Sequence, residues 1–126
     1  MATSREDHAE RAEEAGERKR AQNEAAFRDA NEDIKAIIDG HGADLPTAPF
    51  VCECGDRACR RLINVPVSTY REVRKSPRRF LYDLVHDGQT DEETSTIEKH
   101  DRFLVVEKSG VAGEIAEARW AQAQGA

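Results

Sequence analysis

The sequence is poor in the side chains that usually build a hydrophobic core. Its 126 residues include only four Phe, two Tyr and one Trp, and charged residues (35%) are nearly as frequent as hydrophobic residues (38%). A chain of this length forms one small domain at most, and its core can bury only a modest apolar area. An additional cross-link, such as a bound metal ion, would therefore stabilise the fold appreciably.

Long apolar runs are also missing. No stretch of about eighteen apolar residues occurs, and the charged start of the chain, MATSREDHAERAEEAGERKR, lacks the apolar segment of a signal peptide. We therefore expect a cytoplasmic protein with no membrane contact. Cysteine is scarce as well, and an odd number of three does not suit a framework of disulfide bonds. A metal site or a reactive thiol is the expected use of these cysteines.

The three cysteines lie together in one short motif. Cys52, Cys54 and Cys59 have the spacing Cys-x-Cys-Gly-x(3)-Cys, within the stretch PFVCECGDRACRRLINV. Zinc prefers thiolate ligands in a tetrahedron, and a tight turn, with Gly55 free to adopt a positive φ, can bring three sulfurs together. The motif therefore predicts a zinc-stapled hairpin that needs one more ligand.

The fourth ligand should be a histidine or a carboxylate, and the sequence leaves four candidates: His41, His86, His100 and Asp56. We expect His86, because it ends a predicted strand and can reach the cysteine hairpin without a long loop. His41 lies between two glycines and His100 lies in a charged loop.

The hydrophobic pattern predicts an α+β fold in which an N-terminal amphipathic helix accompanies a small antiparallel β-sheet. Residues 1–20 are highly charged and are expected to be frayed or disordered. Residues 21–40 form the amphipathic helix, residues 49–118 the zinc-binding α+β domain, and residues 119–126 a tail. One stripe of the helix carries its apolar residues: Phe27, Ala30, Ile34, Ile37 and Ile38.

Within the zinc-binding domain, short alternating runs predict four strands, at residues 50–54, 60–67, 78–85 and 102–108. One short helix is inserted between the second and third strands. Thr69 and Glu72 have the spacing of a capping box, which predicts that this helix begins at Thr69 and ends before Pro77. Residues 87–94 are predicted to be a polar loop.

Charge is distributed unevenly along the chain, although the net charge is −6. Residues 83–107 are mainly acidic, whereas residues 57–79 contain a single acidic residue, Glu72, among eight basic ones: Arg57, Arg60, Arg61, Arg71, Arg74, Lys75, Arg78 and Arg79. The two segments can neutralise each other in the folded chain. Alternatively, the basic segment can form an electropositive face for an acidic partner.

The chain resembles an uncharacterised family of short actinobacterial proteins over about residues 22–118. The resemblance rests on the segments NEAAFRDANEDI, FVCECGDRAC, YREVRKSPRRF and DRFLVVEKSGVAGEIAE. In that family a Gly-His pair follows the Arg-Phe strand, and here the matching residues are Val85 and His86, so the glycine is replaced while the histidine is kept. The resemblance implies a role for His86 and a cytoplasmic location, and it implies no activity.

Motifs typical of enzymes are missing: the sequence has no recognisable Ser-His-acid constellation, phosphate-binding glycine loop or His-Glu-x-x-His helix. A catalytic zinc would need an open coordination position, with Glu53 or Asp56 as the group that transfers protons. We instead expect a non-enzymatic regulatory or protein-interaction module whose partner and oligomeric state stay open. The alternatives are nucleic-acid binding through residues 57–79 and a redox switch in which thiol oxidation releases zinc.

Overall fold

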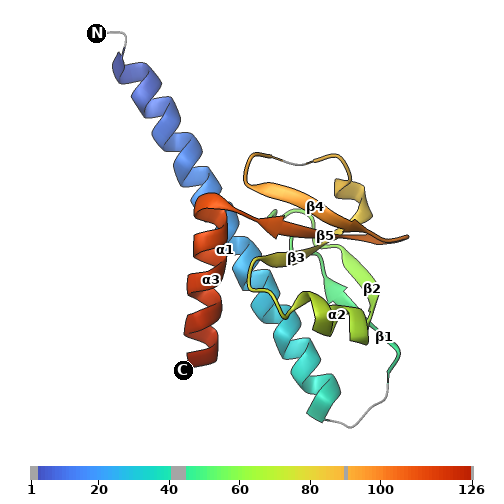
Figure 1. Ribbon diagram of the computed structural model, residues 1–126. Helices are drawn as coiled ribbons and strands as arrows, with labels where there is room; N and C mark the ends of the chain where they lie inside the picture. The colour runs from blue at the N-terminus through green and yellow to red at the C-terminus, as the bar shows by residue number, and fades with distance from the viewer. Residues whose placement is uncertain (1–2, 41–44, 90, 126) are drawn as a thin grey trace.

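The computed structural model describes residues 3–40, 45–89 and 91–125, and within these ranges the chain has the predicted α+β fold. Two small antiparallel sheets lie beside a long N-terminal helix and a C-terminal helix (Figure 1). The elements in chain order are α1 (Thr3–Gly40), β1 (Thr47–Val51), β2 (Leu62–Pro66), α2 (Val67–Val73), β3 (Arg79–Asp83), the 3-10 helix η1 (Leu84–His86), β4 (Thr94–Lys99), β5 (Phe103–Lys108) and α3 (Gly110–Gly125). None of the described helices is long and apolar enough to cross a membrane.

The two sheets are separate, but a backbone hydrogen bond links the end of one to the other. One sheet is the hairpin β1–β2, and the other has the strand order β3-β5-β4. In the hairpin, burial alternates along each strand, so that Phe50 of β1 and its register partner Ile63 of β2 both face the core. Just beyond β1, the amide of Glu53 donates to the carbonyl of Leu81 in β3 over 2.8 Å. The hairpin is thereby held against the edge of the three-stranded sheet.

Helix α1 is longer than the sequence predicts. It begins at Thr3, so residues 1–20, expected to be frayed or disordered, are largely helical from Thr3 onward. Ala, Glu, Arg and Lys dominate this part of the chain, and all four are good helix formers. The side chains of residues 15–20 are nevertheless exposed, in keeping with their lack of large apolar groups.

The buried face of α1 is polar where the sequence predicts an apolar stripe. Ile34 and Ile38 pack against the core, but Ile37 is 62% exposed. Among the side chains of this helix that the structure describes, the buried ones are instead Ala21, Glu24, Ala25, Arg28 and Asn31. Apolar periodicity does not reveal this face, because it is built from polar groups that form hydrogen bonds to distant parts of the chain. Within the described residues, Nε of Arg28 is buried without such a partner.

Arg28 shows how α1 is fastened to its neighbours. Its guanidinium group is fully buried between the rings of Phe80 and Trp120, 5.0 and 5.1 Å from their centroids. It donates hydrogen bonds to the carbonyls of Pro77 (2.6 Å) and Ala116 (3.0 Å). Helix α3 therefore packs along α1 (Figure 1). It continues through the predicted tail boundary at residue 119 as far as Gly125, so the described part of the predicted tail is helical.

Two further sequence predictions are wrong in their local detail. Helix α2 begins at Val67 after Pro66, whose fixed φ of −56° suits a helix start, and Thr69 lies inside the helix and not at its cap. Strand β4 was not predicted, because five of its six side chains are exposed and give no alternating pattern.

Candidate metal centre

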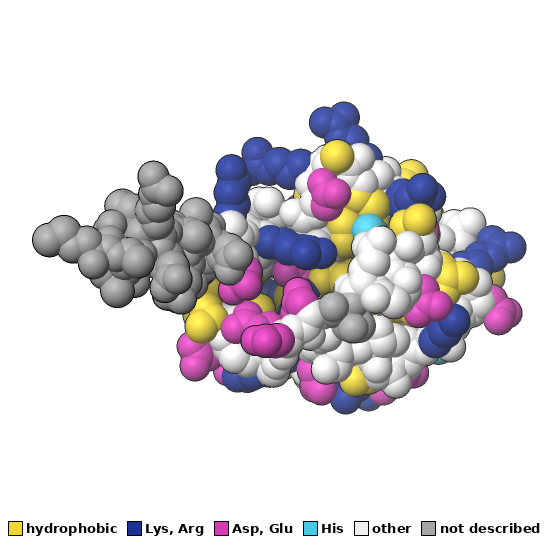
Figure 2. Space-filling model, turned by 90° about the horizontal axis from the view of Figure 1, so that it is seen from above, with side chains coloured by type: hydrophobic (Ala, Val, Ile, Leu, Met, Phe, Trp, Pro, Cys, Tyr) yellow, Lys and Arg dark blue, Asp and Glu magenta, His cyan; other side chains and the backbone are white. Residues whose placement is uncertain are grey.

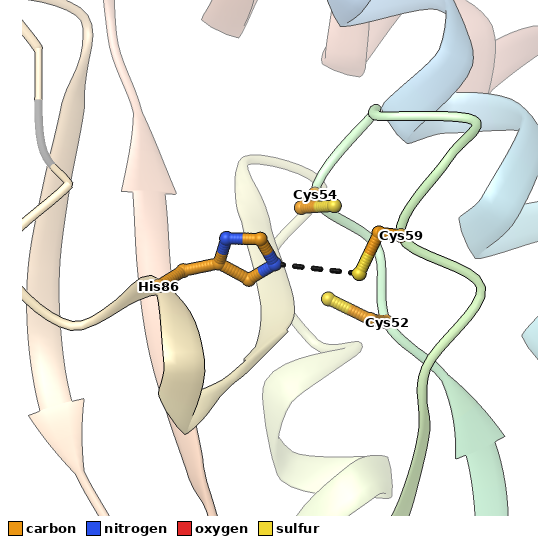
Figure 3. Close-up of side chains that lie close together, drawn as sticks. All are labelled: Cys52, Cys54, Cys59 and His86. Atoms are coloured by element: carbon orange, nitrogen blue, oxygen red, sulfur yellow. Dashed lines mark hydrogen bonds between the residues drawn. The ribbon is translucent and has the colours of Figure 1, made fainter.

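The side chains of the cysteine motif and His86 come from two neighbouring parts of the fold. Cys52 directly follows β1, and Cys54 and Cys59 lie in the turn that leads to β2. His86 ends η1, immediately after β3. Figure 3 shows the three sulfurs and the imidazole ring pointing toward one common point. The hydrogen bonds between the hairpin and β3 thus bring the predicted residues together.

The spacing of the four ligand atoms suits a metal ion. One ligand atom each from Cys52, Cys54, Cys59 and His86 lies within 4.8 Å of the other three. The Cys59 sulfur is 3.5 Å from Nε2 of His86, and ideal tetrahedral zinc geometry would place a sulfur and an imidazole nitrogen about 3.6 Å apart. The structure therefore contains a possible Cys3His metal site.

Groups behind the ligands hold them in position. Nδ1 of His86 is 3.0 Å from the side-chain oxygen of Gln89. An N–H at Nδ1 that donates to this oxygen leaves the lone pair of Nε2 facing the sulfurs, which is the arrangement of a metal-binding histidine. The backbone amide of Asp83 also donates to the Cys52 sulfur over 3.2 Å, and such bonds stabilise a thiolate.

The turn itself is fixed by glycine and by an aspartate. Gly55 has φ +81°, and a Cβ atom there would lie 2.7 Å from the backbone oxygen of Arg20 in α1, so any side chain would push the turn away from the helix. The Asp56 carboxylate accepts a hydrogen bond from the amide of Ala58 over 2.9 Å. The carbonyl of Asp56 accepts one from the amide of Cys59 over 3.1 Å.

The other candidates for the fourth ligand are not part of the cluster. Asp56 is engaged in the turn. The ring of His100 stacks on Phe103 at 4.3 Å and lies 3.4 Å from a carboxylate oxygen of Glu98. His41 lies outside the described residues.

The clustering of the thiols shifts their pKa values. A hydrogen bond from the Cys52 thiol, helped by a backbone amide and by His86, lowers the pKa of Cys54 to about 5 despite burial. The same bond, together with burial, raises the pKa of Cys52, and burial raises the pKa of Cys59. Without a cation the cluster favours one thiolate, whereas a bound divalent ion would favour three.

Glu53, between two of the cysteines, has a role that the sequence does not reveal. Its carboxylate is fully buried and accepts hydrogen bonds from Asn31 of α1 (2.7 Å), Arg74 of α2 (2.6 Å) and the amide of Leu81 in β3 (2.9 Å). Because these donors occupy its oxygens, Glu53 is not positioned as a proton-transfer group for a metal-bound ligand. The only signal of this role in the sequence is the presence of an acidic residue in the strand predicted at residues 50–54.

The basic segment divides into two groups. Five of its eight side chains pair with carboxylates at 2.6–3.8 Å: Arg71 with Asp39, Arg74 with Glu53, Lys75 with Glu72, Arg78 with Glu117 and Arg79 with Glu107. Only Glu107 belongs to the acidic segment of residues 83–107, so the two segments do not simply neutralise each other. Arg57, Arg60 and Arg61 are exposed, and within the described ranges they form no ion pair.

Comparisons with protein-family models, with curated proteins and with solved structures find no match to the chain. The resemblance to short actinobacterial proteins therefore stays a prediction.

Proposed function

We propose that the protein binds one zinc ion through Cys52, Cys54, Cys59 and His86, and that it works as a small, non-enzymatic interaction or regulatory module. The observation that carries this proposal is the convergence of the four ligand atoms within 4.8 Å of one another. Three thiolates and one imidazole form a soft ligand set that favours zinc over magnesium or calcium.

A structural role for zinc is supported by the number of ligands. Four protein ligands complete a tetrahedron and leave no open position for a substrate or water. The buried carboxylate of Glu53, which lies between Cys52 and Cys54 in sequence, accepts hydrogen bonds from Asn31, Arg74 and Leu81. Zinc would instead close the loop between β1 and β2 and attach it to the end of β3. Because three thiols must stay reduced to bind the ion, the proposal places the protein in the cytoplasm.

A protein partner is favoured over nucleic acid. The net charge of −6 repels phosphate groups. Five of the eight basic side chains that could contact phosphates lie beside carboxylates.

Native mass spectrometry of freshly purified, reduced protein tests the proposal, and one zinc per chain is the expected result. Replacing one ligand should lower zinc affinity by more than about 100-fold, since loss of even an outer hydrogen bond costs about 10- to 100-fold. We therefore expect this loss for His86→Ala in competition with a chromogenic chelator. His100→Ala is the matched control and should change affinity less than about threefold. A metal-free mass, or a larger loss for His100→Ala, would contradict the proposal.

A further inference from the structure

The three arginines without carboxylate partners are close in sequence to the cysteines of the metal site. Arg57 lies within the cysteine turn, and Arg60 and Arg61 follow Cys59 directly. All three are exposed, and none forms an ion pair with any residue that the structure describes. A zinc ion with three thiolates carries one net negative charge, which could offset one arginine. Two positive charges would remain available to an external group.

Arg60 occupies a strained position. Its φ is +44°, and in the described part of the chain it is the one non-glycine residue with a positive φ. Glycine or asparagine is the usual residue at such a backbone angle. A long cationic side chain there contributes no ion pair within the described fold. Strain of this kind is typical of positions kept for binding.

Exposed aliphatic side chains border the same site. Leu62, directly after Arg61, is 66% exposed, and Val85, directly before His86, is 51% exposed. The contact between His86 and Cys59 brings these two segments together at the metal site. Seen from above in Figure 2, the surface includes a histidine side chain among hydrophobic side chains, with Lys and Arg side chains nearby. We call Arg57, Arg60, Arg61, Leu62 and Val85 the knuckle face.

We propose that the knuckle face binds an acidic segment of a partner protein, with carboxylates on the arginines and an apolar side chain between Leu62 and Val85. This inference rests on the proposed zinc site, since the ion would fix the relative positions of the turn and η1. Charge complementarity favours an acidic ligand. The knuckle face has no Phe, Tyr or Trp on which bases could stack, and its aliphatic side chains suit a peptide better than a nucleic acid.

The test uses the zinc-loaded full chain and a fluorescein-labelled peptide of ten residues that contains eight glutamates and two leucines. Fluorescence anisotropy should show saturable binding that weakens as salt rises, because the contacts are charged and exposed. Replacing Arg57, Arg60 and Arg61 together with alanine should weaken binding about tenfold. The matched control replaces Arg71, Lys75 and Arg79, which removes the same charge from partnered positions and should change affinity less than about twofold.

Arg60→Gly provides a second variant that should remain folded, because glycine adopts a positive φ without strain. It should keep the zinc and the melting temperature while weakening peptide binding. Equal losses in the two triple variants, or no binding of the peptide to zinc-loaded protein, would overturn the inference. Tighter binding of a ten-nucleotide single-stranded DNA than of the peptide would also overturn it. A chain that carries no zinc in the same preparation would contradict the proposed function, whereas zinc-loaded protein without peptide binding contradicts only this inference.

Discussion

The candidate metal site and the interface beneath α1 are two differently built parts of the same fold. The ligands of the metal site are mostly local, since three of the four lie within one turn. The interface beneath α1 is a polar layer, which we define as three residues of the helix and their buried partners: Glu24, Arg28, Asn31, Glu53, Arg74, Tyr82, Thr94 and Lys108. A chain with few aromatic residues thus combines a small hydrophobic core with a possible metal site and with a layer of buried hydrogen bonds.

Lys108 is the centre of one half of this polar layer. Its buried ammonium group donates to Glu24 (2.6 Å), to the hydroxyl of Tyr82 (2.7 Å) and to the hydroxyl of Thr94 (2.7 Å). The Tyr82 hydroxyl in turn donates to Glu24. Burial raises the pKa of Glu24, and Lys108 counteracts part of that rise. Every charged group here depends on a partner from another element, which makes the layer sensitive to single substitutions.

Removal of the metal should have the largest effect. Chelation of zinc from the reduced protein should lower the melting temperature by more than about 15 °C, because the binding energy of a structural zinc is folding energy. Amide exchange should rise first in residues 52–62, while β3 and β5 keep their protection. The control is the same chelator saturated with zinc. An unchanged melting temperature would mean that the hairpin does not depend on the ion.

Glu53→Ala should have the next largest effect, because it leaves the buried Arg74 without its carboxylate. We expect a loss of about 3–5 kcal/mol in the free energy of unfolding, measured by urea denaturation of zinc-loaded protein. Glu72→Ala is the control, since the Glu72 side chain is 69% exposed in its pair with Lys75, and its loss should stay below about 1 kcal/mol. Similar losses for the two variants would show that the buried Glu53–Arg74 pair contributes no more to stability than the exposed Glu72–Lys75 pair.

Lys108→Met should cost about 3 kcal/mol at neutral pH, with a defined pH dependence. Lys108 lowers the pKa of Glu24, so the substitution raises that pKa further above its unfolded value. A raised carboxyl pKa favours the folded state below the unfolded pKa, and this advantage is lost as pH rises through the folded pKa. The difference in unfolding free energy from the wild type should therefore be smaller at pH 5 than at pH 8. Adding Glu24→Gln should restore most of the loss, and a loss independent of pH would contradict this explanation.

Two glycine substitutions, one beside the candidate metal site and one in the exposed part of α1, should have the smallest effects on stability. Gly55→Ala forces a positive φ on alanine and a Cβ atom against the backbone of α1, so we expect a loss of about 1–3 kcal/mol and weaker zinc binding. Gly16→Ala adds a methyl group to an exposed helical position with nothing within 4 Å, and should gain up to about 1 kcal/mol. Thermal denaturation of the two variants side by side gives both values, and a stabilising Gly55→Ala would contradict the close contact.

The metal site was predictable because its signal is local. Three closely spaced cysteines are enough to predict a metal site or a reactive thiol. The position of His86 after a predicted strand was enough to favour it over His100 as the fourth ligand. The polar layer carried no such signal, since Tyr82 and Glu24 are 58 residues apart and each is an ordinary residue in its own segment. Strand β4 could not be predicted from the sequence for a related reason. It pairs with β5 through its backbone while its side chains, apart from Thr94, remain exposed.

The position of Glu53 bears on how this fold could be divided or recombined. The residue between two candidate metal ligands also links the hairpin by hydrogen bonds to Asn31 of α1 and to Arg74 of α2. A fragment of residues 49–118 would retain all four candidate metal ligands but lose the Asn31 side-chain amide that donates to Glu53. A fusion in which an unrelated amphipathic helix replaces α1 would have the same defect. Helix α1 and the hairpin therefore form one structural unit, and we expect neither to fold normally when it is transferred alone into another protein.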